Sequence, residues 1–230
     1  MVGAVEGPGT WSFGNGVSVT TAAPAAAILI RYSAAGTAQW AQTTATGSAV
    51  FYGLAIDGTG NLYVAGSAVS GTVGFSGGIT TTVGGSASNT LLVKYNSAGT
   101  AQWAASLASG SDFSEFTGVT LDAAGNLDAV GAGAFDFGGG VNATGTGTLS
   151  NLVVTQYSPA GIPLRARSFV SGAGSDGPSF QAVVTDASGG IVAVGNLDDV
   201  TYGLGNGVTV AGSDQASGTA SNALVVKYTD

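Results

Sequence analysis

A period of sixty to seventy residues constrains this chain more than any other feature of its sequence. Three sets of residues recur at this spacing independently of one another. The sets are Tyr32, Tyr95, Tyr157 and Tyr228; Phe13, Phe75, Phe137 and Leu204; and Asp57, Asp122 and Asp186. A fixed period of this length is typical of propellers, solenoids and other arrays of one supersecondary unit.

Each unit contains four strand signals, which we name A to D. They are residues 116–122 (A), 127–131 (B), 91–95 (C) and 100–107 (D). Tight turns join A to B and C to D, so the unit is predicted to be a four-stranded antiparallel meander. The B-to-C links are long and rich in Gly and Thr. There we expect an extension of strand B and a small hairpin, because long structureless loops are uncommon.

The composition favours a folded all-β chain. Forty glycines would suit disorder, but there are only five prolines, and 44% of the residues are hydrophobic. We predict a β-propeller-type array of four-stranded antiparallel blades, with about 3.5 repeats in an open or incomplete ring. A β-solenoid is the alternative, although its period is usually shorter. Residues 1–230 form one domain, with repeats at approximately 1–49 (partial), 50–112, 113–175 and 176–230 (partial).

The strand count does not close a ring. The chain opens in a B strand and ends in a C strand, so it has three A, four B, four C and three D strands. Either the chain is a segment of a longer propeller, or neighbouring copies complete one another by strand addition into a ring or fibre. The candidate assembly edges are Val2, Val5, Leu224, Val226 and Tyr228.

Charge and missing residue types exclude several functions. The net charge is −8 with five basic residues, so no basic groove for nucleic acid is expected, and anionic membranes are disfavoured. Without cysteine or histidine, the chain has no disulfide, thiolate metal site or histidine base. We expect no cofactor, no metal and no membrane insertion. Residues 1–6 do not resemble a signal peptide, although the low charge and abundant Thr, Ser and Gly hint at export.

Several side chains have a functional and a structural interpretation. Trp40 and Trp103 occupy equivalent D positions and could stack on sugars, while packing between blades is favoured. Asp57, Asp122 and Asp186 could hold calcium, but one acidic residue per turn suits a turn cap better. Basic residues precede three of the repeated tyrosines, and we expect their charges to be solvated or locally paired. They are Arg31, Lys94 and Lys227. A glycosidase needs two facing carboxylates, but nothing in the spacing of Asp112/Glu115 or Asp198/Asp199 requires that arrangement, and both pairs lie in predicted loops.

Two hairpin motifs carry a resemblance. Residues 91–99 (LLVKYNSAG) and 118–127 (GVTLDAAGNL) resemble the bacterial seven-bladed β-propeller repeat family, and residues 55–66 (AIDGTGNLYVAG) match its Asp-x-x-Gly-Asn hairpin closely. The resemblance covers nearly the whole chain and implies a secreted or cell-surface bacterial protein without enzymatic activity. The third repeat departs from the pattern at 155–157, 163–164 and 189–190.

These observations predict an exported, non-enzymatic structural or interaction module that assembles head to tail through unpaired end strands. A lectin-like, carbohydrate-binding propeller is the alternative. The expected partner is the chain itself or another protein, with a glycan as the second possibility.

Overall fold

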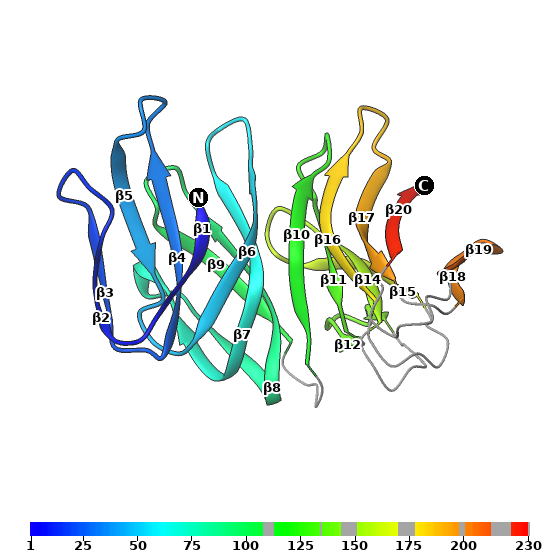
Figure 1. Ribbon diagram of the computed structural model, residues 1–230, viewed down its shortest axis with the longest axis horizontal. Helices are drawn as coiled ribbons and strands as arrows, with labels where there is room; N and C mark the ends of the chain where they lie inside the picture. Colours follow the sequence, from blue (N-terminus) through cyan, green and yellow to red (C-terminus); the bar gives the residue numbers. More distant parts are fainter. Residues whose placement is uncertain are drawn as a thin grey trace.

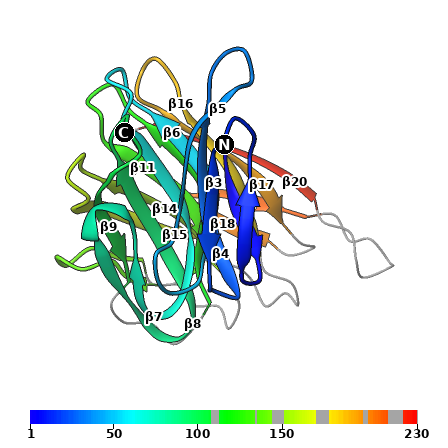
Figure 2. The ribbon, with the colours of Figure 1, turned by 90° about the vertical axis from the view of Figure 1, so that its left-hand side faces the viewer.

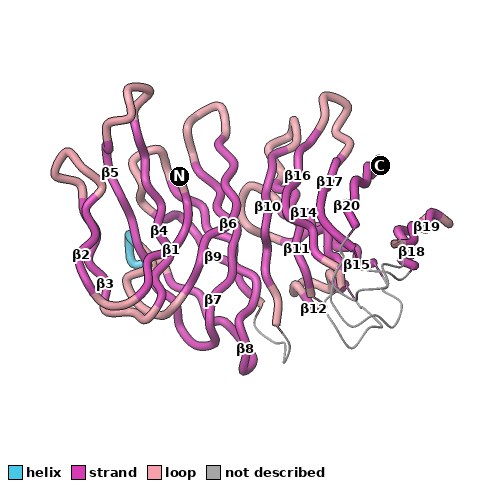
Figure 3. The backbone as a smooth tube through the Cα atoms, viewed as in Figure 1, coloured by secondary structure: helices cyan, strands magenta, loops and turns pink. Residues whose placement is uncertain are grey.

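The protein is built almost entirely from antiparallel strands joined by tight turns (Figure 3). The computed structural model describes residues 1–107, 113–133, 135–143, 151–169, 178–197, 201–212 and 222–229. Within these ranges the only helical segment is one 3₁₀ turn, η1 (Ser76–Gly78), and there is no α-helix. The predicted all-β class is therefore confirmed.

Two central sheets have four strands in the order of the chain. The second sheet contains β6 (Ala49–Ile56), β7 (Leu62–Gly74), β8 (Thr80–Tyr95) and β9 (Ala101–Ser106). The third contains β10 (Glu115–Leu121), β11 (Leu127–Ala132), β14 (Leu152–Tyr157) and β15 (Pro163–Phe169). These orders match the A-B-C-D meander expected from the sequence.

The two outer sheets have three strands each. The first contains β1 (Val2–Glu6), β4 (Ala25–Tyr32) and β5 (Ala38–Thr43), which are types B, C and D. The fourth contains β16 (Ser179–Thr185), β17 (Ile191–Leu197) and β20 (Asn222–Tyr228), which are types A, B and C. The first sheet thus lacks an A strand and the fourth lacks a D strand, as the strand count predicted.

The long B-to-C links form the expected hairpins. They are β2 (Gly9–Ser12) with β3 (Ser18–Thr21), β12 (Phe135–Asp136) with β13 (Asn142–Ala143), and β18 (Thr201–Gly205) with β19 (Val208–Ala211). In the second sheet the link instead extends β7 and β8, which stay paired as far as Gly74 and Thr80. Seen end-on, the hairpin β2–β3 lies over the outer side of the first sheet (Figure 2), where Val19 joins the cluster of Ile28 and Ile30.

The four sheets stand side by side in chain order, with the first and fourth at opposite ends (Figure 1). Each boundary between sheets is a hydrophobic core. Leu29 packs with Val93 at the first boundary, Leu92 with Phe116 at the second, and Val154 with Phe180 at the third. A buried side chain of this size contributes about 1.5–3 kcal/mol. No strand of the first sheet pairs with one of the fourth within the described ranges.

A β-bulge recurs where each A strand meets its B strand. The register shifts between Phe51 and Gly53 in the second sheet, and Thr117 and Gln181 are the extra residues in the third and fourth. The B-strand residue opposite each bulge is glycine: Gly66, Gly131 and Gly195. A β-carbon there would overlap a carbonyl oxygen of the A strand, that of Val50, Glu115 or Ser179. The bulge therefore explains the glycine that ends the repeated aliphatic run.

Gly131→Ala should be strongly destabilising, because the added methyl overlaps the Glu115 carbonyl and forces β10 away from β11. We expect a loss above about 3 kcal/mol, at the severe end for one substitution. Urea unfolding monitored by circular dichroism measures it. Gly203→Ala is the matched control, since a β-carbon at Gly203 meets no atom within 4 Å. Equal stability of the two variants would contradict the bulge explanation.

Candidate functional site

The free edges of the two outer sheets are the first candidate interaction site. In the described chain, β1 pairs only with β4, and β20 pairs only with β17. Each edge therefore presents backbone N–H and C=O groups that no described strand pairs. The candidate residues do not point outwards there: Val5, Leu224 and Val226 are buried, and Val2 and Tyr228 are half-buried. A partner strand at these edges would therefore bind through backbone hydrogen bonds, not through these side chains.

The second candidate is the outer face of the fourth sheet. Val184, Val194 and Val225 are exposed on it, and Val225 is 70% accessible. The residue at the equivalent place in the second sheet, three positions before the repeated tyrosine, is Leu92, which is 1% accessible. We call Val184, Val194 and Val225 the valine face. It has the composition of an inter-sheet boundary, but none of the described sheets lies against it.

The valine face was not predicted from the sequence, although a signal was present. In β20 the run Leu224-Val225-Val226 is apolar on both sides of the strand, with Leu224 and Val226 buried and Val225 exposed. Continuous apolar runs are typical of strands buried on both faces, whereas half-exposed strands alternate with polar residues.

The two equivalent tryptophans pack against the next sheet. A β-carbon at Gly99 would lie 2.9 Å from the Trp40 ring, and one at Gly161 would lie 2.9 Å from the Trp103 ring. Both glycines belong to C-to-D turns and have positive φ. Trp103 also donates a hydrogen bond from Nε1 to the Pro159 carbonyl (3.1 Å). These contacts fit the packing interpretation.

The basic residues before the repeated tyrosines make local contacts. Arg31 Nη1 donates to the Ser97 carbonyl at 2.8 Å, so it links the first sheet to the second. Lys94 lies 4.9 Å from the centroid of the Tyr63 ring and 3.5 Å from the Pro159 carbonyl of the third sheet. Lys227 forms a 2.6 Å ion pair with Asp186. The expectation of locally paired charges is confirmed for these residues.

The carboxylates of Asp57, Asp122 and Asp186 accept hydrogen bonds from amides of their own turns. Asp57 Oδ1 accepts hydrogen bonds from the amides of Thr59 and Asn61, both at 2.9 Å, and Oδ2 accepts one from Asn61 Nδ2 at 2.8 Å. Asp122 and Asp186 accept the same pair of turn amides. Across the residues that the structure describes, no group of three acidic side chains gathers as a cation site. The geometry therefore fits the turn interpretation rather than calcium.

Hydrogen bonding lowers the pKa of two of these carboxyls. For Asp57, desolvation raises the pKa, but the hydrogen bonds from Thr59 and Asn61 outweigh it and hold the pKa well below its usual range. For Asp186, Lys227 is the largest cause of a lowered pKa, followed by Ser188 and Gly190. Both carboxylates therefore stay ionised in the folded chain under acidic conditions that protonate the unfolded chain.

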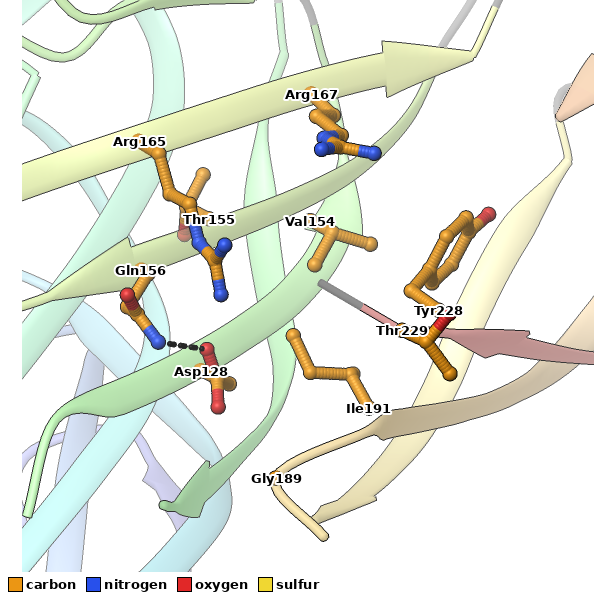
Figure 4. A pocket seen from close by; sticks show the side chains of 10 residues that line it. All are labelled: Asp128, Val154, Thr155, Gln156, Arg165, Arg167, Gly189, Ile191, Tyr228 and Thr229. Atoms are coloured by element: carbon orange, nitrogen blue, oxygen red, sulfur yellow. Dashed lines mark hydrogen bonds between the residues drawn. The ribbon is translucent and has the colours of Figure 1, made fainter. Parts of the chain in front are cut away.

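A small pocket with both polar and apolar side chains in its lining lies between the third and fourth sheets (Figure 4). Asp128 is fully buried there and accepts a 2.9 Å hydrogen bond from Gln156 Nε2, and Arg165 and Arg167 project from β15 on the same side. The volume of about 30 Å³ holds about one water molecule. A site for a small organic ligand usually needs 300 Å³ or more, so this pocket is too small for one.

Three of the polar side chains at this pocket belong to one cross-strand row that differs between the second and third sheets. In the second sheet the row is Tyr63, Lys94 and Trp103, and in the third it is Asp128, Gln156 and Arg165. The sequence departs from the repeat around residue 156, but only the strand register places all three changes side by side. Asp128 was missed because one acidic residue in an apolar strand does not reveal its partners.

Of the remaining acidic candidates, only Glu115 lies within the described residues. Asp112, Asp198 and Asp199 lie outside the described residues. Glu115 is half-buried in β10, where desolvation raises its pKa and a hydrogen bond with Tyr52 opposes the shift.

In comparisons with known proteins, no family model and no curated protein matches this chain. The resemblance to the bacterial seven-bladed repeat family therefore stays a prediction.

Within the described ranges no helix is long and apolar enough to cross a membrane.

Trp103→Ala should lower the free energy of unfolding by about 2–3 kcal/mol, because the ring packs on Gly161 and Tyr63. This loss is smaller than that expected for a fully buried tryptophan, because the Trp103 ring is only half-buried. Chemical unfolding measures the loss, and Trp11→Ala, at an exposed position in β2, is the control. A stable Trp103→Ala protein would contradict the packing role.

Acid should destabilise the fold through the turn aspartates. Because the folded pKa values of Asp57 and Asp186 lie below the unfolded value of about 3.9, their contribution is fully present above about pH 4. It decreases as the pH falls below that value. Urea unfolding at neutral pH and at about pH 3 tests this, with Asp57→Asn expected to reduce the difference. If neither Asp57→Asn nor Asp186→Asn reduced the difference in unfolding free energy between the two pH values, the turn aspartates would not be the cause of the acid sensitivity.

Proposed function

We propose that the protein is an exported, non-enzymatic structural or interaction module that joins further copies head to tail into a ring or fibre. Its four sheets act as propeller-type blades, and its outer sheets form the contacts. The observation that carries the proposal is the exposed valine face at one end of the row of sheets.

The valine face supports association because its equivalents are internal boundaries. Val225 is exposed where Leu92 and Val154 are buried against the following sheet. Monomeric proteins rarely expose contiguous apolar patches larger than a few hundred Å². Covering it with another sheet would repeat a contact that the fold already makes three times.

The opposite end of the molecule supports a head-to-tail rather than a back-to-back contact. Trp11 is exposed on β2, in the hairpin that covers the outer side of the first sheet. Apolar surface therefore occurs at both ends, on two different patches. Two unlike patches make a heterologous contact, which propagates into a ring or a filament.

The propeller-type arrangement is supported by the close approach of the A strands. A β-carbon at Gly53 would lie 3.0 Å from the Gly118 Cα, and one at Gly118 would lie 3.2 Å from the Ala182 Cα. The A strands of successive sheets are therefore neighbours, which is the relation expected of strands nearest a common axis.

A non-enzymatic role is supported by the chemistry of the available side chains. The chain has no histidine or cysteine, and its turn carboxylates accept hydrogen bonds from their own turns. A carbohydrate-binding role remains the second proposal, but the packing of Trp40 and Trp103 leaves it without a supporting contact. Titrating tryptophan fluorescence with a panel of glycans separates the two, because only the lectin-like role predicts a saturable change.

Val225→Asp should abolish self-association without unfolding the chain, because the side chain is 70% accessible. Light scattering after size exclusion should show wild-type species heavier than 22.1 kDa that grow with protein concentration. The variant should remain at 22.1 kDa.

Ile162→Asp is the matched control, since Ile162 is also exposed but lies in the C-to-D turn of the third sheet. It should associate like the wild type. A wild-type protein that stays monomeric at every concentration would overturn the head-to-tail proposal.

A further inference from the structure

The first sheet retains a glycine that only a missing strand would require. Gly3 in β1 pairs with Ile28, and in the other sheets the corresponding B-to-C pairs place Gly66, Gly131 and Gly195 at this position. Those three glycines cannot carry a β-carbon because the bulged A strand lies against them. At Gly3 a β-carbon would meet only Ile28 Cγ1, at 4.0 Å, and its φ is not positive. Nothing within this structure therefore demands glycine there.

An aromatic contact is also incomplete in the first sheet. Tyr95 and Tyr157 each meet the A-strand phenylalanine of their own sheet edge-on, with centroids 6.4 Å apart for Phe51 and 6.2 Å for Phe116. Tyr32 holds the equivalent place but has no A strand beside it. It is 37% accessible, whereas Tyr95 is 1% accessible.

A cavity of about 210 Å³ lies beside Met1, at the start of β1. Met1 and Tyr32 line one side of it, and Leu54, Ile56 and Leu62 of the second sheet line the other. Ile56 is 59% accessible, while Leu121, its counterpart one repeat later, packs against the boundary of the second and third sheets. The space therefore lies where the A strand of a sheet would cover its neighbour.

We infer that the free edge of β1, with this cavity, is an acceptor site for an A-type strand from a second polypeptide. The incoming strand carries an aromatic residue, then any residue, then Gly or Ala, then an aliphatic residue. The aromatic side chain completes the contact with Tyr32, and the residue after it forms the bulge that Gly3 accommodates. The small residue is required because the next sheet's A strand approaches closely, as Gly53 meets Gly118.

This inference rests on the proposed role as an interaction module, and it specifies the partner at one edge. The segments of this chain with the required pattern are Phe51-Tyr52-Gly53-Leu54, Phe116-Thr117-Gly118-Val119 and Phe180-Gln181-Ala182-Val183. All three are paired within their own sheets. Because these segments are already paired, none of them is the free partner strand. The C-type strand β20 of another copy (NALVVKY) lacks the required pattern.

A peptide with the sequence of residues 113–122 is the probe. Added to the isotopically labelled full chain, it should bind saturably and slow the hydrogen exchange of β1 amides that do not bond to β4. The same peptide with Phe116→Ala or Gly118→Val should bind at least tenfold more weakly. A peptide of residues 222–228 tests the C-type alternative, and preferential binding of that peptide would overturn the inference.

Gly3→Val in the protein is the decisive variant. It should leave the melting temperature unchanged, unlike Gly131→Val, and weaken binding of the 113–122 peptide at least tenfold. Equal binding to the wild type and Gly3→Val, or no binding at all, would overturn the acceptor site.

The two proposals fail separately. Concentration-dependent association that Val225→Asp abolishes would stand even if no peptide bound. Peptide binding that Gly3→Val abolishes would stand even if the wild-type chain were monomeric.

Discussion

The structure depends on sheets that are apolar on both faces and therefore need a neighbour on each side. Leu92 and Leu91 are consecutive residues of β8 that point to opposite faces, and both are buried, one against the third sheet and one against the first. Because the hydrophobic contribution scales with buried apolar area, most of the stabilisation lies between sheets rather than within them. A row of such sheets is stable in its interior and leaves apolar surface at its ends.

The outer apolar face is covered at one end of the row of sheets and exposed at the other. At the first sheet, the hairpin β2–β3 covers Ile28 and Ile30, so the outer side there is largely closed by the chain's own link. At the fourth sheet, the hairpin β18–β19 joins the inner cluster through Tyr202 and Leu204 and leaves the valine face open. The asymmetry gives the molecule two unlike ends, which is the property that head-to-tail association needs.

Much of the fold could be predicted from the sequence because the repeat places equivalent residues at a constant spacing. The strand order, the Asp-capped turns and the missing A and D strands all follow from aligning Tyr32 with Tyr95 and Asp57 with Asp122. The bulge opposite Gly66 was less visible, since a glycine after an aliphatic run also suits a turn. Only the pairing of Phe51 with Gly66 gives the steric reason for that glycine.

The features that the sequence did not predict depend on which residues meet across strands and sheets. The row of Asp128, Gln156 and Arg165 joins three strands, so its members are not neighbours in the sequence. The valine face was hidden for a similar reason, since Val225 looks like its buried counterpart Leu92 until the neighbouring sheet is known to be absent. Repeat spacing predicts the positions, while exposure depends on what lies beside them.

Negative-stain electron microscopy of the purified chain over a range of concentrations tests the central claim most directly. If the two outer sheets bind other copies of the chain, rings or filaments should form, with one 22.1 kDa chain as the repeating unit. Separate single-chain particles at every concentration would contradict the account.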